Sequence, residues 1–312
     1  MSTPPNTGAG RRSEVEIGMG LMALTMLAAP GMDAIAKLLG ETLAPGQIAW
    51  GRFGFQTLLL LPFMLATGRR VRTGQAAVHA ARGALLGTAL LLLIWALQYL
   101  PLANALAIFF VEPLILTLFS ALFLGERIGG RRLAAVVVGL AGALVVIRPN
   151  WAAFGWGAVL PLGTAICFAG YLTLTRHAVA SEDPLALQLW AGLFAALLLT
   201  AAVLAGAGLA LPVLDPVWPD GREWSLLVTL GLFSAVTHVL IATAFRLAPA
   251  GILAPFQYIE IVSATALGVL LFGDFPDAIT WAGTALIIGS GLYVYARERK
   301  LARGLRSVPQ AE

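Results

Sequence analysis

The segment Tyr99–Glu126 reads YLPLANALAIFFVEPLILTLFSALFLGE, and a similar segment, Leu247–Asp274, reads LAPAGILAPFQYIEIVSATALGVLLFGD. Each contains an apolar run of about 22 residues, which is long enough to cross a bilayer, with one carboxylate near its middle. That carboxylate costs about 2.5–3.5 kcal/mol unless it faces protein or water. At an offset of 148 positions the following residues coincide: Pro101 with Pro249, Glu112 with Glu260, Gly125 with Gly273, and Glu126 with Asp274. Because the chain accepts this energetic cost at two equivalent positions, we predict that both carboxylates belong to a functional site.

The composition predicts an all-α integral membrane protein. The 312 residues are 59% hydrophobic and only 12% charged, with a mean hydropathy of +0.86, whereas soluble domains carry about 25% charged residues. The basic excess, 20 Lys and Arg against 16 Asp and Glu, lies in short connections and the C-terminal tail. There it acts as a topology signal and does not indicate nucleic-acid binding. Cys167 is the only cysteine, so no intramolecular disulfide can form.

The apolar runs predict ten transmembrane helices. Residues 1–15, polar and rich in Gly and Pro, are expected to form a disordered cytoplasmic tail, and residues 298–312 a second cytoplasmic tail. With the N-terminus in the cytoplasm, sixteen basic side chains, Arg82 among them, fall inside and only Arg148 and Arg222 fall outside, as the positive-inside rule requires. The predicted spans are 16–39, 45–67, 80–99, 103–125, 131–148, 154–178, 184–208, 224–247, 250–272 and 277–297.

The repeat extends over the whole membrane part of the chain. At an offset of about 139, four further pairs coincide: Gly31 with Gly170, Lys37 with Arg176, Pro45 with Pro184, and Phe55 with Phe194. The chain therefore divides into halves of five spans, 16–148 and 149–297. Because five is odd, the second half must be inverted in the membrane, and inverted repeats support transport by alternating access.

The stretch LANALAIFFVEPLILTLFSALFLGERIGGRRLAAVVVGLAGALVVIRP, at 102–149, resembles the drug/metabolite transporter superfamily, EamA group, and the resemblance covers residues 17–297. FQYIEI followed by LLFGDFPD resembles members of the group assigned to uptake of organic cofactors such as riboflavin or S-adenosylmethionine. The resemblance implies a central cavity formed by spans one, three and four with their partners six, eight and nine. It implies a secondary transporter in the bacterial cytoplasmic membrane that moves a small organic metabolite, with export of amino acids or drug-like compounds as the alternative. No cofactor or metal is expected, and a homodimer is left open.

Glu112 and Glu260 are the principal candidates for substrate binding. Asn104 shares a helix face with Glu112 at steps of four, and Gln257 and Tyr258 lie within a turn of Glu260. These side chains are predicted to line the cavity and bind a cationic or hydrogen-bonding group. Alternatively, each carboxylate forms hydrogen bonds with a neighbouring helix, or with backbone groups that a proline leaves unpaired.

Asp33, Lys37 and Arg52 are predicted to form a gating or structural ion pair. Asp33 and Lys37 are four residues apart with the acid first, the favourable order within a helix, and Arg52 is a second partner for Asp33. Both cations lie toward the outer end of a span, from which they can reach the interface.

Trp95, Gln98 and Tyr99 share one face of span three at steps of three and four, and in a cavity they could stack on a planar cargo. The alternative is that the aromatic residues anchor the span at the membrane interface. Tyr171 and His238 are intramembrane polar groups that either line the cavity or bond a neighbouring helix.

Small residues allow helices in the fifth and tenth spans to approach closely. They are Gly139 and Gly142 in the fifth, and Gly283, Gly289 and Gly291 in the tenth. Whether they pack the halves together or join two protomers is left open.

Other function classes lack their motifs. The chain contains no HExxH, no GxSxG and no GxxxxGK[ST], so neither an intramembrane enzyme nor a nucleotide-driven pump is predicted. A channel would need recurring polar stripes along its spans, which are absent from the sequence.

Overall fold

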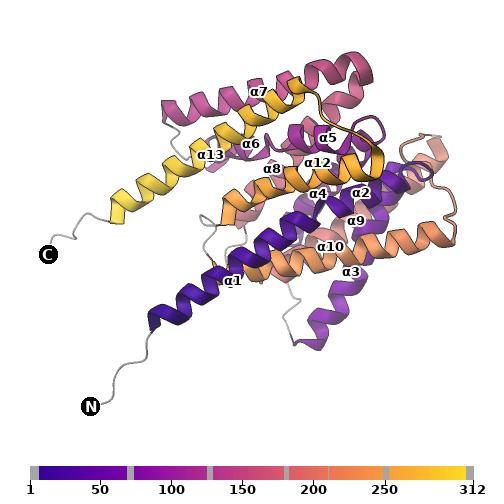
Figure 1. Cartoon of the computed structure of the whole chain (residues 1–312). Helices are drawn as coiled ribbons and strands as arrows, with labels where there is room; N and C mark the ends of the chain where they lie inside the picture. Colours follow the sequence, from indigo (N-terminus) through magenta and orange to yellow (C-terminus); the bar gives the residue numbers. More distant parts are fainter. Residues whose placement is uncertain are drawn as a thin grey trace.

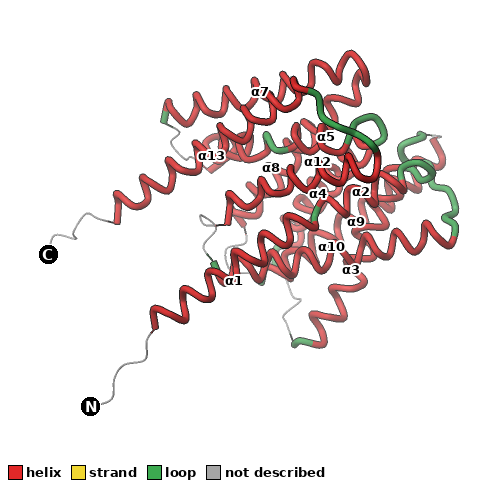
Figure 2. Tube along the Cα trace, in the orientation of Figure 1, coloured by secondary structure: helices red, strands yellow, loops and turns green. Residues whose placement is uncertain are grey.

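The computed structural model describes residues 7–68, 74–124, 129–178, 183–209, 211–248 and 253–306, and every regular element among them is helical (Figures 1 and 2). The helices are α1 (Thr7–Ala28), α2 (Pro30–Leu39), α3 (Pro45–Ala66), α4 (Ala76–Leu97), α5 (Leu102–Phe109), α6 (Glu112–Leu124), α7 (Gly130–Phe154), α8 (Leu160–Ala178), α9 (Pro184–Leu209), α10 (Gly221–Leu247), α12 (Ile259–Phe272) and α13 (Ala278–Arg306), with two 3-10 helices, η1 (Gly155–Val159) and η2 (Ala254–Tyr258).

Seven helical stretches of the described chain have the length and apolar composition needed to cross a membrane. The runs predicted at 131–148, 250–272 and 277–297 are shorter apolar helices in the structure: Leu133–Ile147, Phe256–Phe272 and Ala278–Val294. The fold is therefore that of a multi-pass helical membrane protein, and the count of ten spans stays a prediction.

Three of the predicted continuous runs are interrupted in the structure. The run 16–39 breaks between α1 and α2 at Pro30, and the run 103–125 breaks between α5 and α6 just before Pro113. The run 250–272 contains η2, with Pro255 at its start, and changes to α12 at Ile259. Proline has no N–H to donate to the preceding turn, so each helix must end or change its winding there.

The two ends of the chain are more helical than the sequence suggested. α1 begins at Thr7, so residues 7–15, predicted to be disordered, are helical, and α13 continues to Arg306. Both ends lie on the same side of the helical bundle (Figure 1).

The two halves of the chain interleave in the core, where α4 packs against α8 and α9. A Cβ atom added to Gly83 of α4 would lie 2.5 Å from Phe194 Cβ and 2.8 Å from the Ala191 carbonyl oxygen, so the backbones of α4 and α9 are nearly in contact. This close approach requires a residue without a side chain at position 83.

A second close contact joins α7 and α13, which run side by side along one edge of the bundle (Figure 1). A Cβ atom on Gly142 would lie 2.9 Å from the Gly283 carbonyl oxygen, and one on Gly283 would lie 2.5 Å from Val146 Cγ2. Glycines predicted to allow close packing thus lie at the contact between the fifth and tenth predicted spans within one chain.

Candidate functional site

A cavity of about 230 Å³ lies between the helices of both halves of the chain. Its lining comes from every described helix except α7, α13 and the 3-10 helix η1. The walls are mostly apolar, with a small number of polar groups, as in small-molecule sites. The polar lining residues are Asp33, Arg52, Glu112, Thr164, Gln188, Thr237, His238, Gln257 and Glu260.

The three carboxylates of the cavity share one local feature. Asp33, Glu112 and Glu260 each lie in the first turn of a helix, α2, α6 and α12 respectively. α2 and α6 begin next to Pro30 and Pro113, whereas α12 follows directly on the 3-10 helix η2, which contains Pro255. The first N–H groups of a helix point toward its start, and the helix dipole favours a negative charge there by up to about 2 kcal/mol when the site is partly buried. The breaks therefore create the environment that holds three acids inside an apolar bundle.

Arg52 of α3 supplies the positive charge of the cavity. Its Nη1 lies 3.8 Å from Asp33 Oδ1, and its Nε donates to Ser234 Oγ at 3.3 Å. The Ser234 hydroxyl in turn donates to Gln56 Oε1 at 2.7 Å. Glu260 interacts electrostatically with both Asp33 and Arg52, so two acids and one base form a single charged cluster.

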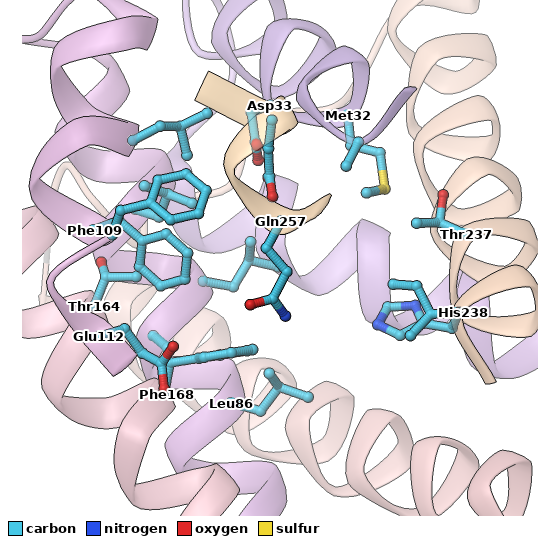
Figure 3. Close-up of a pocket in the computed structure, with 18 of the residues that line it drawn as sticks. Met32, Asp33, Leu86, Phe109, Glu112, Thr164, Phe168, Thr237, His238 and Gln257 are labelled. Carbon is cyan, nitrogen blue, oxygen red and sulfur yellow. The ribbon is translucent and has the colours of Figure 1, made fainter. Parts of the chain in front are cut away.

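The remaining polar groups lie on opposite walls. Figure 3 shows Glu112 and Phe168 on one side, His238 on the other, and the side chain of Gln257 extending between them. His238 donates from Nδ1 to the Ser234 carbonyl oxygen at 2.7 Å, because a carbonyl oxygen can only accept. The described residues contain no group of three or more His, Cys, Asp or Glu side chains placed to hold a metal ion.

Of the predicted cavity residues, Glu112, Glu260, Gln257 and His238 line the cavity, and so do two of the predicted ion-pair residues, Asp33 and Arg52. Each comes from a different element of the fold. The sequence-predicted acids of both halves therefore meet in one place, together with the polar groups of spans one, two and eight.

Three other predicted residues are not part of the cavity lining. The Tyr258 ring packs at a tilt of 38° against Phe110, a lining residue, with ring centroids 5.9 Å apart. Asn104 is buried in α5. Tyr171 is buried in α8, and its hydroxyl donates to Oε1 of Gln188, which lines the cavity, at 3.4 Å.

The predicted aromatic face of span three lies elsewhere. Trp95, Gln98 and Tyr99 line a separate space of about 610 Å³ between the ends of α2 and α4 and the loop 211–217, which we call the second hollow. The Gln98 amide donates to the Gly40 carbonyl oxygen at 3.0 Å. Helical spacing correctly grouped these three residues, but it could not predict their depth in the bundle.

Lys37 does not pair with Asp33. Its Nζ lies 2.6 Å from Asp274 Oδ2 and 4.4 Å from the centroid of the Phe272 ring, so it links the end of α2 to the end of α12. Asp274 is 237 positions away in the sequence, and only the tertiary fold brings it closer than the acid one turn away. The helix-spacing argument for an Asp33–Lys37 pair is therefore wrong.

Sequence reasoning assigned no site role to Arg82, which it counted as part of the charge signal for topology. The side chain is fully buried, and its Nε donates to Thr175 Oγ1 at 2.9 Å. It also donates to the Leu187 carbonyl oxygen at 3.3 Å and the Tyr171 hydroxyl at 3.4 Å. It therefore joins α4 to α8 and α9 next to the wall of the cavity. The only signal in the sequence is its position two residues inside the predicted third span.

Long apolar helices around an internal cavity that contains a few polar and charged groups define a multi-pass membrane protein with a small-molecule site, the arrangement of a transporter. A model of the EamA-like transporter family matches residues 16–148 and again residues 155–296. The chain therefore belongs to the EamA-like transporter family.

Three relatives indicate the range of cargoes within this group. The S-adenosylmethionine uptake transporter of Rickettsia felis is 29% identical over 91% of this chain and 94% of its own length. The riboflavin transporter of Vibrio cholerae is 30% identical over 84% of this chain and 86% of its own. The pseudopaline exporter of Pseudomonas aeruginosa is 31% identical over 82% of this chain and 88% of its own length.

One solved crystal structure has the same fold. It superposes with a TM-score of 0.61 at 22% identity and covers 93% of this chain and 99% of its own. The likeness therefore extends over the whole helical bundle.

Proposed function

We propose that the cavity is the cargo site of a secondary carrier that takes up a small organic metabolite by alternating access. The observation that carries the proposal is the convergence of Asp33, Glu112 and Glu260, each at the restart of a helix, on one cavity that also contains Arg52. A site with three acids and one base favours a cargo with a net positive charge. Such a cargo replaces the water that the carboxylates would otherwise need.

The apolar part of the cavity indicates the shape of that cargo. Phe109 and Phe168 line it with their rings edge to face, 5.6 Å between centroids, and aromatic faces of this kind accept a planar ring. A planar ring with polar or cationic substituents is the chemistry of the cofactor-like cargoes named for the uptake relatives. The volume of about 230 Å³ is below the roughly 300–1,000 Å³ of drug-sized ligand pockets, so cargo binding would require the cavity to expand.

The proposed topology is ten spans in two inverted halves, in the bacterial inner membrane, with both termini in the cytoplasm. The family model matches two segments of similar length, which supports a repeat. Phe110 and Tyr258, equivalent at the offset of 148, are in ring contact with each other, and residues that contact their own equivalents lie near the axis relating two repeats. The ends of α1 and α13 on one side of the bundle support an even number of crossings (Figure 1).

The test is transport by the purified full-length chain in proteoliposomes, with labelled S-adenosylmethionine and riboflavin as the first cargoes in uptake and counterflow assays. We expect Glu112→Gln and Glu260→Gln each to lower kcat/KM by about 10- to 100-fold, because each removes one charged hydrogen-bond partner inside the cavity. Glu16→Gln, the same change at an exposed position of α1, is the matched control and should transport normally.

Two results would contradict the proposal. Undiminished transport by both cavity variants would remove the carboxylates from the mechanism. A chain that is folded yet binds and moves neither S-adenosylmethionine nor any other organic cation would remove the proposed cargo class.

Export is the second candidate, because the pseudopaline exporter is as similar to this chain as the uptake transporters are. The direction is tested by comparing right-side-out and inside-out vesicles under the same ion gradients. Accumulation of cargo only in inside-out vesicles would favour export and overturn uptake.

A further inference from the structure

The second hollow lies in line with the central cavity along two shared helices. Asp33 of α2 and Leu93 of α4 line the cavity, whereas Gly40, just after α2, and Trp95, two residues beyond Leu93, line the second hollow. Seven residues separate Asp33 from Gly40, which corresponds to about 10 Å along a helix. In the proposed topology the second hollow therefore lies directly outside the cavity.

The loop 211–217 that forms one wall is held in place by hydrogen bonds. Gln47, buried at the start of α3, donates to the Val217 carbonyl oxygen at 2.7 Å and accepts from the Val217 N–H at 3.1 Å. The Gly46 N–H donates to the Val213 carbonyl oxygen at 2.9 Å. These three bonds make the second hollow a preformed space rather than a gap beneath a free loop.

The chemistry of the lining favours an organic cation. Trp95 and Tyr99 supply aromatic rings and Gln98 an amide, while Glu41 and Asp215 supply two exposed carboxylates. The lining includes no Lys or Arg, and neither acid has an ion-pair partner within the described residues. Aromatic faces and unpaired acids together attract planar or sulfonium- and ammonium-bearing molecules.

We propose that the second hollow is a docking site at which a cationic, planar cargo binds from the outside before it enters the central cavity. The inference rests on the proposed function and adds a second binding step to it. It also gives a role to the Trp95–Gln98–Tyr99 face, which the cavity does not use.

The experiment measures transport of S-adenosylmethionine, a sulfonium cation with a planar base, by Glu41→Gln and Asp215→Asn in both vesicle orientations. We expect the KM for uptake in right-side-out vesicles to rise about two- to fivefold for each variant, because an exposed charge contributes only modestly. The KM measured from the opposite face should not change, and neither should the KM for riboflavin, which carries no cationic centre. Asp277→Asn removes an exposed acid that caps α13 and lies outside the second hollow, and it is the matched control.

A second measurement reports on the second hollow even where transport is absent. Quenching of tryptophan fluorescence by S-adenosylmethionine is compared between the wild type and Trp95→Phe. We expect a saturable component that disappears in Trp95→Phe and weakens in Glu41→Gln and Asp215→Asn.

Unchanged uptake KM together with quenching that does not depend on Trp95 would overturn the docking site. If the Glu112 and Glu260 variants still lose transport in the same series, the proposed carrier function survives that failure. Conversely, Trp95-dependent binding with no transport by the wild type would retain the docking site and reject the carrier proposal.

Discussion

The segments that carry Glu112 and Glu260 occupy equivalent positions in the sequence, yet they give their carboxylates different surroundings. Glu260 belongs to a charged cluster with Asp33 and Arg52. Glu112 is 8% exposed in a largely apolar wall, and one of the groups on which it acts electrostatically is Tyr258, which comes from the other segment. The repeat therefore reproduces the helix break and the acid, while the neighbouring helices make one acid part of an ion network and leave the other in an apolar setting.

The strongest way to test this difference is to remove the base of the cluster. We expect Arg52→Gln to lower the free energy of unfolding by about 3 kcal/mol, because it leaves the buried Asp33 and the nearby, partly buried Glu260 without a compensating cation. Asp33→Asn in the same chain should restore much of that loss. Thermal unfolding in one detergent gives the comparison with Glu112→Gln in the largely apolar wall, a change that we expect to alter the unfolding temperature little. Equal destabilisation by Arg52→Gln and Glu112→Gln would mean that the two environments do not differ.

A second prediction concerns the break that positions Glu112. Pro113→Ala supplies the missing N–H, so α5 and α6 can join into one helix and Glu112 leaves the first turn. We expect kcat/KM to fall on the order of tenfold, through displacement of the acid, without loss of thermal stability. Pro62→Ala is the control, since Pro62 lies inside α3 at an exposed position away from the cavity. Normal transport by Pro113→Ala would show that the break is not needed for Glu112 to act.

The smallest effect is expected at the end of the second segment, where Asp274 pairs with Lys37. Its equivalent in the first segment, Glu126, lies outside the described residues. The Lys37 and Asp274 side chains are 18% and 29% exposed, so their ion pair contributes at most about 1 kcal/mol. Breaking the pair should therefore change the conformational equilibrium of the protein by a few fold. The measurement is the rate of thiol labelling of Thr237→Cys in a Cys167→Ser background.

Lys37→Asp and Asp274→Lys should each accelerate that labelling about two- to fivefold, and the double exchange should return it toward the starting rate. Additive effects of the two changes would show that the contact does not hold α2 against α12.

Hydropathy and the internal repeat were sufficient to predict a helical membrane protein and the convergence of Glu112 and Glu260 on one cavity. These predictions depend on local composition and on a fixed offset, both of which are properties of the sequence. The prolines at 30 and 113 also signalled where helices stop, although the predicted runs passed over them.

The partners of individual side chains could not be predicted in the same way. Lys37 has an acid one turn away and still pairs with Asp274, since the choice depends on how α2 and α12 dock. In the sequence, Arg82 resembles the other basic residues predicted for the cytoplasmic side. Its burial depends on α8 and α9, which pack over it only in the folded protein. Trp95 and its two neighbours share a face as their spacing requires, but which space that face meets depends on the loop 211–217.

The contact between Gly142 and Gly283 places the backbone of α7 close to that of α13, because a Cβ atom on Gly142 would lie 2.9 Å from the Gly283 carbonyl oxygen. Neither helix contributes to the cavity wall. This close contact allows little relative sliding or separation of α7 and α13, because a gap or a bulkier group between the two helices would remove their backbone contact. We therefore expect the opening of either face to be a rotation with α7 and α13 as its fixed hinge, with the largest displacement at the helices farthest from them.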